Sequence, residues 1–193
     1  MRGNWNWLQK LGFLLVLLSC LGLLGTQLLA KRNQTVARDL ANRIASMLPP
    51  ASEGLPGEYS DPAMPVLQVD GVDFAGLIRV ASFGITLPIA DSWENGAVST
   101  CPRRFWGSVY DNSLILGGSS ASGQFAFCGE MDLGDTIVIT DMTGAEFSYE
   151  AARIDRRKEA TMQTLQEEGY DLTLFVRDDA SMNYIIVRCV FSP

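Results

Sequence analysis

The longest apolar run of the chain lies close to its N-terminus. Leu11 to Ala30 contains twenty residues and no charged side chain. As a helix rising about 1.5 Å per residue, this run would span roughly 30 Å, the thickness of a bilayer's hydrocarbon core. Trp5 and Trp7 stand where an interfacial aromatic belt would lie. We therefore expect residues 1–30 to form an N-terminal transmembrane helix that anchors the chain.

Two other interpretations of this run are a cleaved signal peptide and a lipoprotein signal. The run is longer than the ~7–15 apolar residues of a usual signal peptide, and Leu28-Leu29-Ala30 makes a poor cleavage site. Leu17-Leu18-Ser19-Cys20 loosely resembles a lipobox, but the apolar run continues past Cys20. These features favour an uncleaved signal anchor in the cell membrane. Because the rest of the chain follows the anchor, we expect a single-pass protein whose domain is extracytoplasmic.

Residues 31–48 show the pattern of an amphipathic helix that Pro49-Pro50 would end. Apolar side chains recur at every fourth residue, at Val36, Leu40, Ile44 and Leu48. Such a helix is either a stalk for a partner or a helix packed on its own domain, and the second is favoured. Residues 49–65 are rich in Gly, Pro and acidic residues without an apolar period, which predicts a linker.

From residue 66 onward the pattern is that of short strands separated by turns such as Met142-Thr143-Gly144. One internal helix is expected, from Ala160 to Glu168, ended by Gly169. Many short strands and one crossover helix predict a mainly all-β domain, a closed barrel over residues 66–193. The expected strands are Gly76–Ala81, Gly84–Ile89, Ser113–Leu116, Thr136–Thr140, Phe147–Ile154, Asp171–Val176 and Tyr184–Val190.

Charge and cysteine content limit which partners and metal sites are expected. The residues after position 30 hold all 22 acidic and 13 of the 15 basic side chains, a net charge of −9, which argues against nucleic acid as a partner. The chain has four cysteines, no CxxC spacing and no histidine, so we expect no zinc site and no cofactor. Cys101 and Cys128 could pair in an oxidising compartment, but their spacing does not decide this.

Four stretches between Asp70 and Pro193 resemble, in order, the motifs of sortases, the cysteine transpeptidases that attach surface proteins to the Gram-positive cell wall. The first is GLIRVASFGITLPIADSW, with Ala81 where the family has proline. The others are CPRRFWGSVYDNSLILGGSSASGQFAFCGEMDLGDTIVIT, DMTGAEFSYEAARI and YDLTLFVRDDASMNYIIVRCVFSP. The resemblance implies a sortase-like closed β-barrel of about eight strands with a short crossover helix, and an N-terminal anchor fits it.

The same resemblance implies a lost active site. Sortase chemistry needs a Cys nucleophile, a His that transfers protons and an Arg that stabilises the tetrahedral intermediate. Here Gly118 stands at the His position, Arg177 at the Cys position and Tyr184 at the Arg position. The absence of histidine does not depend on the alignment, and no other ordinary side chain titrates near neutral pH. Cys128 and Cys189 are expected to be buried structural thiols.

Polar residues near the substituted catalytic positions could still form a groove. Its possible residues are Arg177, Asp178, Asp179, Ser119 and Ser120. They either form a peptide-binding groove or simply contain an arginine paired with its acidic neighbours, and the second is favoured. The basic cluster of Arg153, Arg156, Arg157 and Lys158 is expected to be a solvated face.

The expected function is therefore that of a catalytically inactive pseudosortase at the cell surface of a Gram-positive organism. It would bind or scaffold during surface-protein or pilus assembly, with an exported surface protein, a sorting-signal peptide or an active sortase as partner. One alternative is a sortase-family enzyme, transpeptidase or hydrolase, with a non-standard site such as a Ser119 or Ser120 nucleophile. Another is a purely structural membrane protein.

Overall fold

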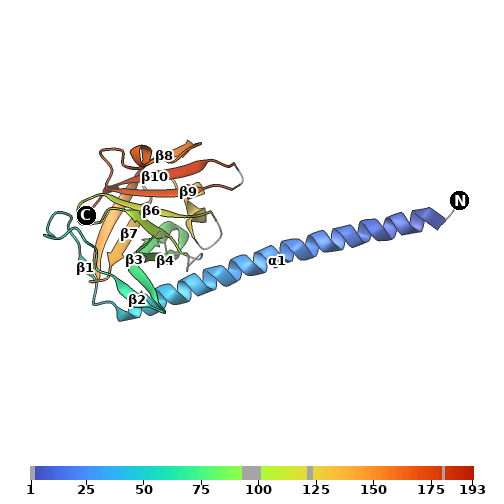
Figure 1. The fold of residues 1–193 in the computed structure, drawn as a ribbon, viewed down its shortest axis with the longest axis horizontal. Coiled ribbons are helices and arrows are strands. Elements are labelled where there is room, and N and C mark those ends of the chain that lie inside the picture. Colours follow the sequence, from blue (N-terminus) through green and yellow to red (C-terminus); the bar gives the residue numbers. More distant parts are fainter. Residues whose placement is uncertain (1–2, 93–100, 121–123, 180) are drawn as a thin grey trace.

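The computed structural model describes residues 3–92, 101–120, 124–179 and 181–193 of the chain. One long helix, α1 (Gly3–Met47), ends against a β-barrel and runs away from it towards the N-terminus (Figure 1). Two short strands, β1 (Ser52–Glu53) and β2 (Leu67–Val69), lie outside the ring of the barrel. The architecture is mainly β, as the sequence predicts.

Eight strands close the barrel, in the order β3, β4, β5, β6, β9, β10, β8, β7 and back to β3. All neighbours are antiparallel except the pairs β4–β5 and β6–β9, which are parallel. The expectation of a closed barrel is confirmed. The strands are β3 (Val72–Val80), β4 (Ile85–Ala90), β5 (Arg103–Trp106), β6 (Leu114–Ser119), β7 (Thr136–Asp141), β8 (Ala145–Arg157), β9 (Leu172–Arg177) and β10 (Tyr184–Phe191).

Each of the seven strands expected from the sequence is present with slightly different bounds, whereas β1, β2 and β5 were not expected. Two of these are only two and three residues long, which is too short for a period to show. β5 reads Arg-Arg-Phe-Trp, without alternation of apolar and polar residues. A β-bulge between Arg104 and Trp106 breaks its pairing with β6, which explains the missing alternation.

The internal helix is shorter than expected, because α2 covers only Met162–Leu165 and not Ala160 to Glu168. Thr161 starts it with a capping box. The barrel ends it, since Arg188 donates to the carbonyl of Thr164 at 2.6 Å and Thr173 donates to that of Leu165 at 3.3 Å. Both carbonyls would otherwise accept bonds from the next turn of a longer helix.

The C-terminal part of α1 packs on the barrel through Ala37, Ala41 and Ile44, which are buried. Small side chains at two of these positions let the helix approach β4 closely. Of the expected apolar stripe, Ile44 is buried and Leu40 and Leu48 pack against the same cluster, whereas Val36 is 47% exposed. An ion pair between Arg43 and Asp70, 2.9 Å long, joins the helix to the β2–β3 turn.

Residues 49–65, expected as a linker, lie on the barrel surface. β1 pairs in parallel with the start of β8, and Met64 is buried. The ring of Tyr59 stacks on that of Tyr110 with centroids 3.8 Å apart. The segment therefore ties the end of α1 to the barrel.

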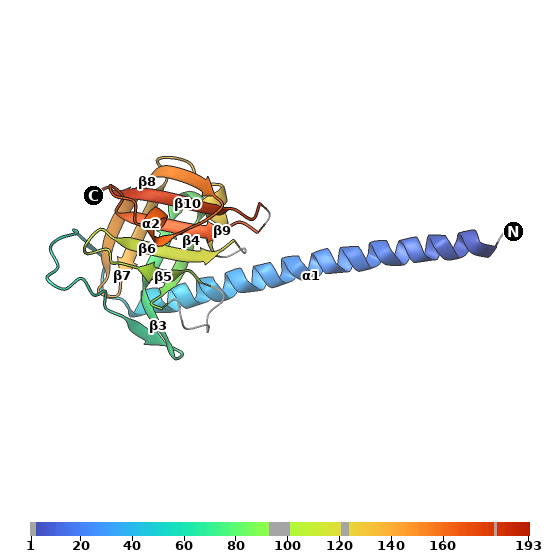
Figure 2. The ribbon, with the colours of Figure 1, turned by 45° about the horizontal axis from the view of Figure 1, so that its top comes forward.

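The N-terminal part of α1 projects beyond the barrel in both views (Figures 1 and 2). Large apolar side chains between Leu11 and Leu21 are exposed there, Phe13 at 69% and Val16 at 61%. Among the described residues, no helix contains an apolar stretch long enough to cross a membrane.

A buried carboxylate holds one end of the barrel together. Asp141 is fully buried and accepts three bonds on Oδ1, from the backbone N–H and the hydroxyl of Thr143 and from the N–H of Ala145. Its Oδ2 accepts a bond of 2.6 Å from the hydroxyl of Tyr110. Burial, and then the bond to Asp141, raise the pKa of Tyr110 above its usual value. Asp141 thus joins the β7–β8 turn to the loop between β5 and β6.

We predict that Asp141→Ala lowers the free energy of unfolding by about 3 kcal/mol or more, because it leaves buried N–H and O–H donors without an acceptor. Chemical denaturation of the full chain in detergent would measure the loss. Asp39→Ala is the matched control, since Asp39 is exposed on α1 and its loss should change stability by less than about 0.5 kcal/mol. An equal effect of the two variants would contradict the prediction.

Candidate functional site

The three positions that the sortase resemblance singles out come together at one end of three neighbouring strands. β6 pairs in parallel with β9, which sets Ser119 beside Arg177, and β10 sets Tyr184 beside Arg177 on the other side. Gly118 pairs with Val176, one residue before this row. We call Ser119, Arg177 and Tyr184 the site row. Ser119 and Arg177 are exposed and Tyr184 is half-buried.

Gly118 itself faces the barrel interior. Leu114 and Leu116, on the same side of β6, are buried in the main core. A Cβ built on Gly118 would lie 2.8 Å from the ring of Phe125, closer than side-chain carbons approach. Phe125 is fully buried at the start of the short 3-10 helix η2 (Phe125–Gly129). The space for a side chain at position 118 is therefore filled.

Arg177 is not paired with its acidic neighbours, contrary to the favoured expectation. Among the ion pairs of the described residues none includes Arg177, and its Nη2 lies 3.7 Å from the Sδ of Met182. Asp178 instead shapes the β9–β10 turn, accepting a bond from the Ser181 hydroxyl at 2.6 Å. Arg177 thus presents an exposed guanidinium at the end of β9.

Ser119 of the site row and the adjacent Ser120 have other partners. The Ser119 N–H donates to Gln124 Oε1 at 2.9 Å. The Ser120 hydroxyl donates to Asp179 Oδ2 at 3.3 Å across the end of the strands. The structure therefore brings together all five of the expected groove residues, Ser119, Ser120, Arg177, Asp178 and Asp179, at one end of the barrel.

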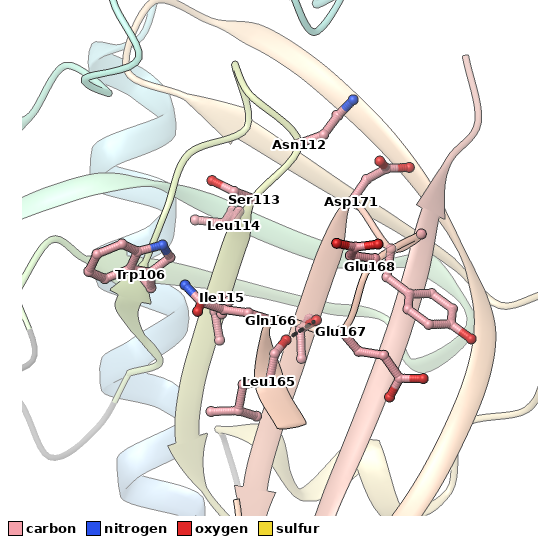
Figure 3. A pocket seen from close by; sticks show the side chains of 13 residues that line it. Trp106, Asn112, Ser113, Leu114, Ile115, Leu165, Gln166, Glu167, Glu168 and Asp171 are labelled. Carbon is pink, nitrogen blue, oxygen red and sulfur yellow. Dashed lines mark hydrogen bonds between the residues drawn. The ribbon is translucent and has the colours of Figure 1, made fainter. Parts of the chain in front are cut away.

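An apolar floor continues from the site row along the outer face of β6, β9 and β10. Phe175 lies edge-on to Phe105 of β5 with ring centroids 5.2 Å apart. Ile115, Ile186 and Leu165 of α2 complete a small buried cluster with Phe175. Beyond this cluster lies a cavity of about 320 Å³ between the β5–β6 segment and the chain that joins α2 to β9 (Figure 3).

The three cysteines of the barrel domain are buried and none forms a disulfide. Burial raises the pKa of the Cys101 thiol to about 11. Burial, and then the neighbouring Cys189, raise the pKa of Cys128 well above its usual value, and burial also raises that of Cys189. A thiol must lose its proton to act as a nucleophile, so these three side chains are packing residues.

A fully buried arginine is the feature that the sequence did not reveal. Arg188 pairs with Asp155 and, at 3.0 Å, with Glu167, and it lies over the ring of Tyr170. Arg153, expected on a solvated face, binds the same two carboxylates at 3.1 and 2.8 Å. This network, which we call the arginine clamp, fixes the chain between α2 and β9 over the strands. Its signal in the sequence is one charged residue within the apolar run of β10.

We predict that Gly118→Ala lowers the free energy of unfolding by about 1–3 kcal/mol, because the methyl group meets the Phe125 ring. The backbone of Gly118 is not left-handed, so alanine meets no strain of its own. In a Phe125→Leu background the added cost should fall below about 0.5 kcal/mol, which a double-mutant cycle of denaturation curves would measure. Gly129→Ala is the control, since its nearest neighbour is Ile185 Cδ1 at 3.6 Å. If the losses of stability from Gly118→Ala and Phe125→Leu simply add in the double variant, the predicted clash between the two side chains is wrong.

We also predict that a Cys20→Ser variant shows no fast-reacting thiol at pH 8 and three after unfolding. Because the raised pKa values keep these groups protonated, labelling of Cys101 should accelerate only as the pH approaches 11. The measurement is the rate of reaction with an aromatic disulfide reagent. Rapid labelling of one thiol at neutral pH would expose an unrecognised nucleophile.

Comparison with known proteins gives matches only among solved structures. No known family profile and no curated protein sequence matches the chain. Sortase C1 from Streptococcus agalactiae has a TM-score of 0.56 and 21% identity over 65% of this chain and 71% of its own. The Clostridium perfringens sortase D5 transpeptidase has a TM-score of 0.51 and 18% identity over 63% of this chain and 80% of its own.

Clostridium perfringens sortase C, solved with the C-terminal cell wall sorting motif, aligns over 85% of this chain and 88% of its own. Its TM-score is 0.54 and its identity is 16%. At these identities the likeness is one of fold. The fold expected from the sequence motifs is confirmed, and the chain has the β-barrel fold of the sortases.

Proposed function

We propose that the chain is a membrane-anchored, extracytoplasmic pseudosortase that holds a segment of an exported protein without cleaving it. The observation that carries the proposal is the pairing of Gly118 with Phe125, because the place of the proton-transferring side chain is filled by a buried ring. A site that had merely lost one residue would leave room for it. Here the core has closed over the position.

The other two catalytic roles lack a substitute. Arg177 stands where a thiolate would attack, and a guanidinium is not deprotonated in proteins, so it supplies no nucleophile. Tyr184 stands where a cation would stabilise the developing oxyanion. The thiols of the domain are buried and protonated. Each lost role typically costs orders of magnitude in rate.

The site row and the apolar floor support a role in binding. Phe105 and Tyr184 are half-buried and pack on the buried cluster of the floor, so they offer apolar surface beside the strands. Arg177 offers five N–H donors at the end of β9. A planar guanidinium binds carboxylate or backbone carbonyl oxygens with defined geometry. An extended peptide laid along the floor, with an acidic group or its main chain at Arg177, uses both features. The Clostridium perfringens sortase C solved with a cell wall sorting motif suggests the class of peptide to try.

Anchoring is the second part of the proposal. The uncharged run from Leu11 to Ala30 and the exposed apolar side chains of Phe13 and Val16 favour a lipid environment for that end of α1. The β9–β10 turn lies on the side of the barrel from which α1 departs (Figures 1 and 2). With α1 in a membrane, the site row would face the membrane, where an exported surface protein, its sorting signal or an active sortase could be held.

We predict that the full chain in detergent binds one or more fluorescent sorting-motif peptides and cleaves none of them. Fluorescence anisotropy measures binding, and release of a quenched fluorophore measures cleavage. Arg177→Ala should weaken binding about tenfold, because the guanidinium is the charged anchor of the groove. Arg38→Ala, which removes an exposed arginine of α1, should leave affinity unchanged.

A reconstruction tests the cause of inactivity. Gly118→His, Arg177→Cys and Tyr184→Arg together should not restore cleavage even when Phe125→Ala is added, because position 118 faces the barrel interior whereas positions 177 and 184 lie on the outer face. Cleavage by the wild type would overturn the proposal. In that case, loss of cleavage in Ser120→Ala or Asp179→Asn would assign the reaction to these two residues, which share a hydrogen bond of 3.3 Å. Absence of binding to every peptide, together with absence of cleavage, would leave a structural role.

A further inference from the structure

The cavity beyond the apolar floor has the size of a single side-chain pocket. Its volume of about 320 Å³ is at the lower end of the range for ligand sites. Ile115 and Thr173, which pair across β6 and β9, lie at its base, and Leu165 of α2 lies on one side. Trp106 of β5 and Glu168 lie on opposite sides of β6 in the close view (Figure 3).

Three carboxylates and an unpaired amide oxygen lie among the polar groups that line this cavity. Asn112 Oδ1 is buried and has no hydrogen-bond partner. Asp171 accepts a bond from the N–H of Phe191 on Oδ2, and Glu168 is exposed at the rim. Neither carboxylate forms an ion pair within the described residues, whereas Glu167 is occupied by Arg153 and Arg188. The cavity is therefore complementary to a group that donates hydrogen bonds and carries positive charge.

Trp106 adds the aromatic component of such a site. Its side chain is 53% exposed although it pairs with Ile115 in the sheet, and it lines the cavity. An indole ring attracts a cation to its face and packs against the methylene groups that carry it. Ile115 and Leu165 extend the apolar wall deeper. A long side chain with a charged end fits this combination better than a metal ion, and no group of metal-binding side chains occurs among the described residues.

We infer that this cavity binds the basic side chain of a partner polypeptide, an alkylammonium or guanidinium group held between Trp106 and Glu168. The Ile115–Thr173 pair lies four residues along β6 and β9 from the Ser119–Arg177 pair. At about 3.3 Å per residue this is a separation of roughly 13 Å, the length of four extended residues. The inference rests on the proposed function in that the side chain belongs to the peptide held along the floor.

The first experiment tests the pocket without any peptide. The full chain in detergent is titrated with Nα-acetyl-lysine amide and, separately, with Nα-acetyl-norleucine amide, which keeps the alkyl chain and lacks the ammonium. Calorimetry should detect the lysine probe and find binding of the norleucine probe at least about tenfold weaker. Glu168→Gln and Trp106→Leu should each weaken the lysine probe about threefold to tenfold. Glu159→Gln, which removes an exposed carboxylate outside the cavity, should leave binding unchanged.

Equal binding of the two probes, binding unaffected by both cavity variants, or no binding of the lysine probe would each overturn the inference. The second experiment separates it from the proposed function. In the best peptide of the panel, a lysine placed about four residues from the end that needs Arg177 should strengthen binding relative to norleucine, and Glu168→Gln should abolish that gain. Peptide binding that depends on Arg177 but gains nothing from the lysine would overturn the cavity assignment and leave the proposed function standing.

Discussion

The parallel pairing of β6 with β9 is the constraint on which the site depends. These strands are far apart in the chain, and joining them places Ser119 beside Arg177 and leaves the outer face of the sheet as a floor. The interior side of the same strands is wholly apolar, with Leu116, Leu174 and Val176 in the main core. Stability thus comes from one face and chemistry from the other, so the outer residues can be replaced while the barrel is kept.

The arginine clamp shows how the fold controls the wall of the groove. Arg188 is fully buried, and two carboxylates, a backbone carbonyl and an aromatic ring surround it. Buried ion pairs add little net stability, but removing one partner leaves an uncompensated charge and is strongly unfavourable. The clamp therefore works as a positioning device. It stops α2 after Leu165 and sets the course of the chain that lines the cavity.

Much of the barrel could be predicted from the sequence, because its long strands carry clear alternation and their turns carry glycine. The misses have physical causes. β5 is bulged and has no period, and α2 ends where barrel side chains take its carbonyls, which no local pattern encodes. The positions of the site row could be read from sequence motifs. The contact of Phe125 with Gly118 could not, because it arises only from the packing of the folded chain. The exposed state of Arg177 depends likewise on the bonds of its acidic neighbours, since Asp178 accepts from Ser181 within the turn and Asp179 accepts from Ser120 after β6.

The contact between Gly118 and Phe125 also bears on the history of the chain. Restoring a side chain at position 118 first costs a steric clash, and removing the ring first leaves a cavity that typically costs about 3–5 kcal/mol. Domains commonly have only about 5–15 kcal/mol of stability to lose. Whichever of the two residues changes first, the single variant is less stable than the starting chain, so the contact opposes both substitutions. A side chain larger than glycine at position 118 is therefore reached only together with a change at position 125.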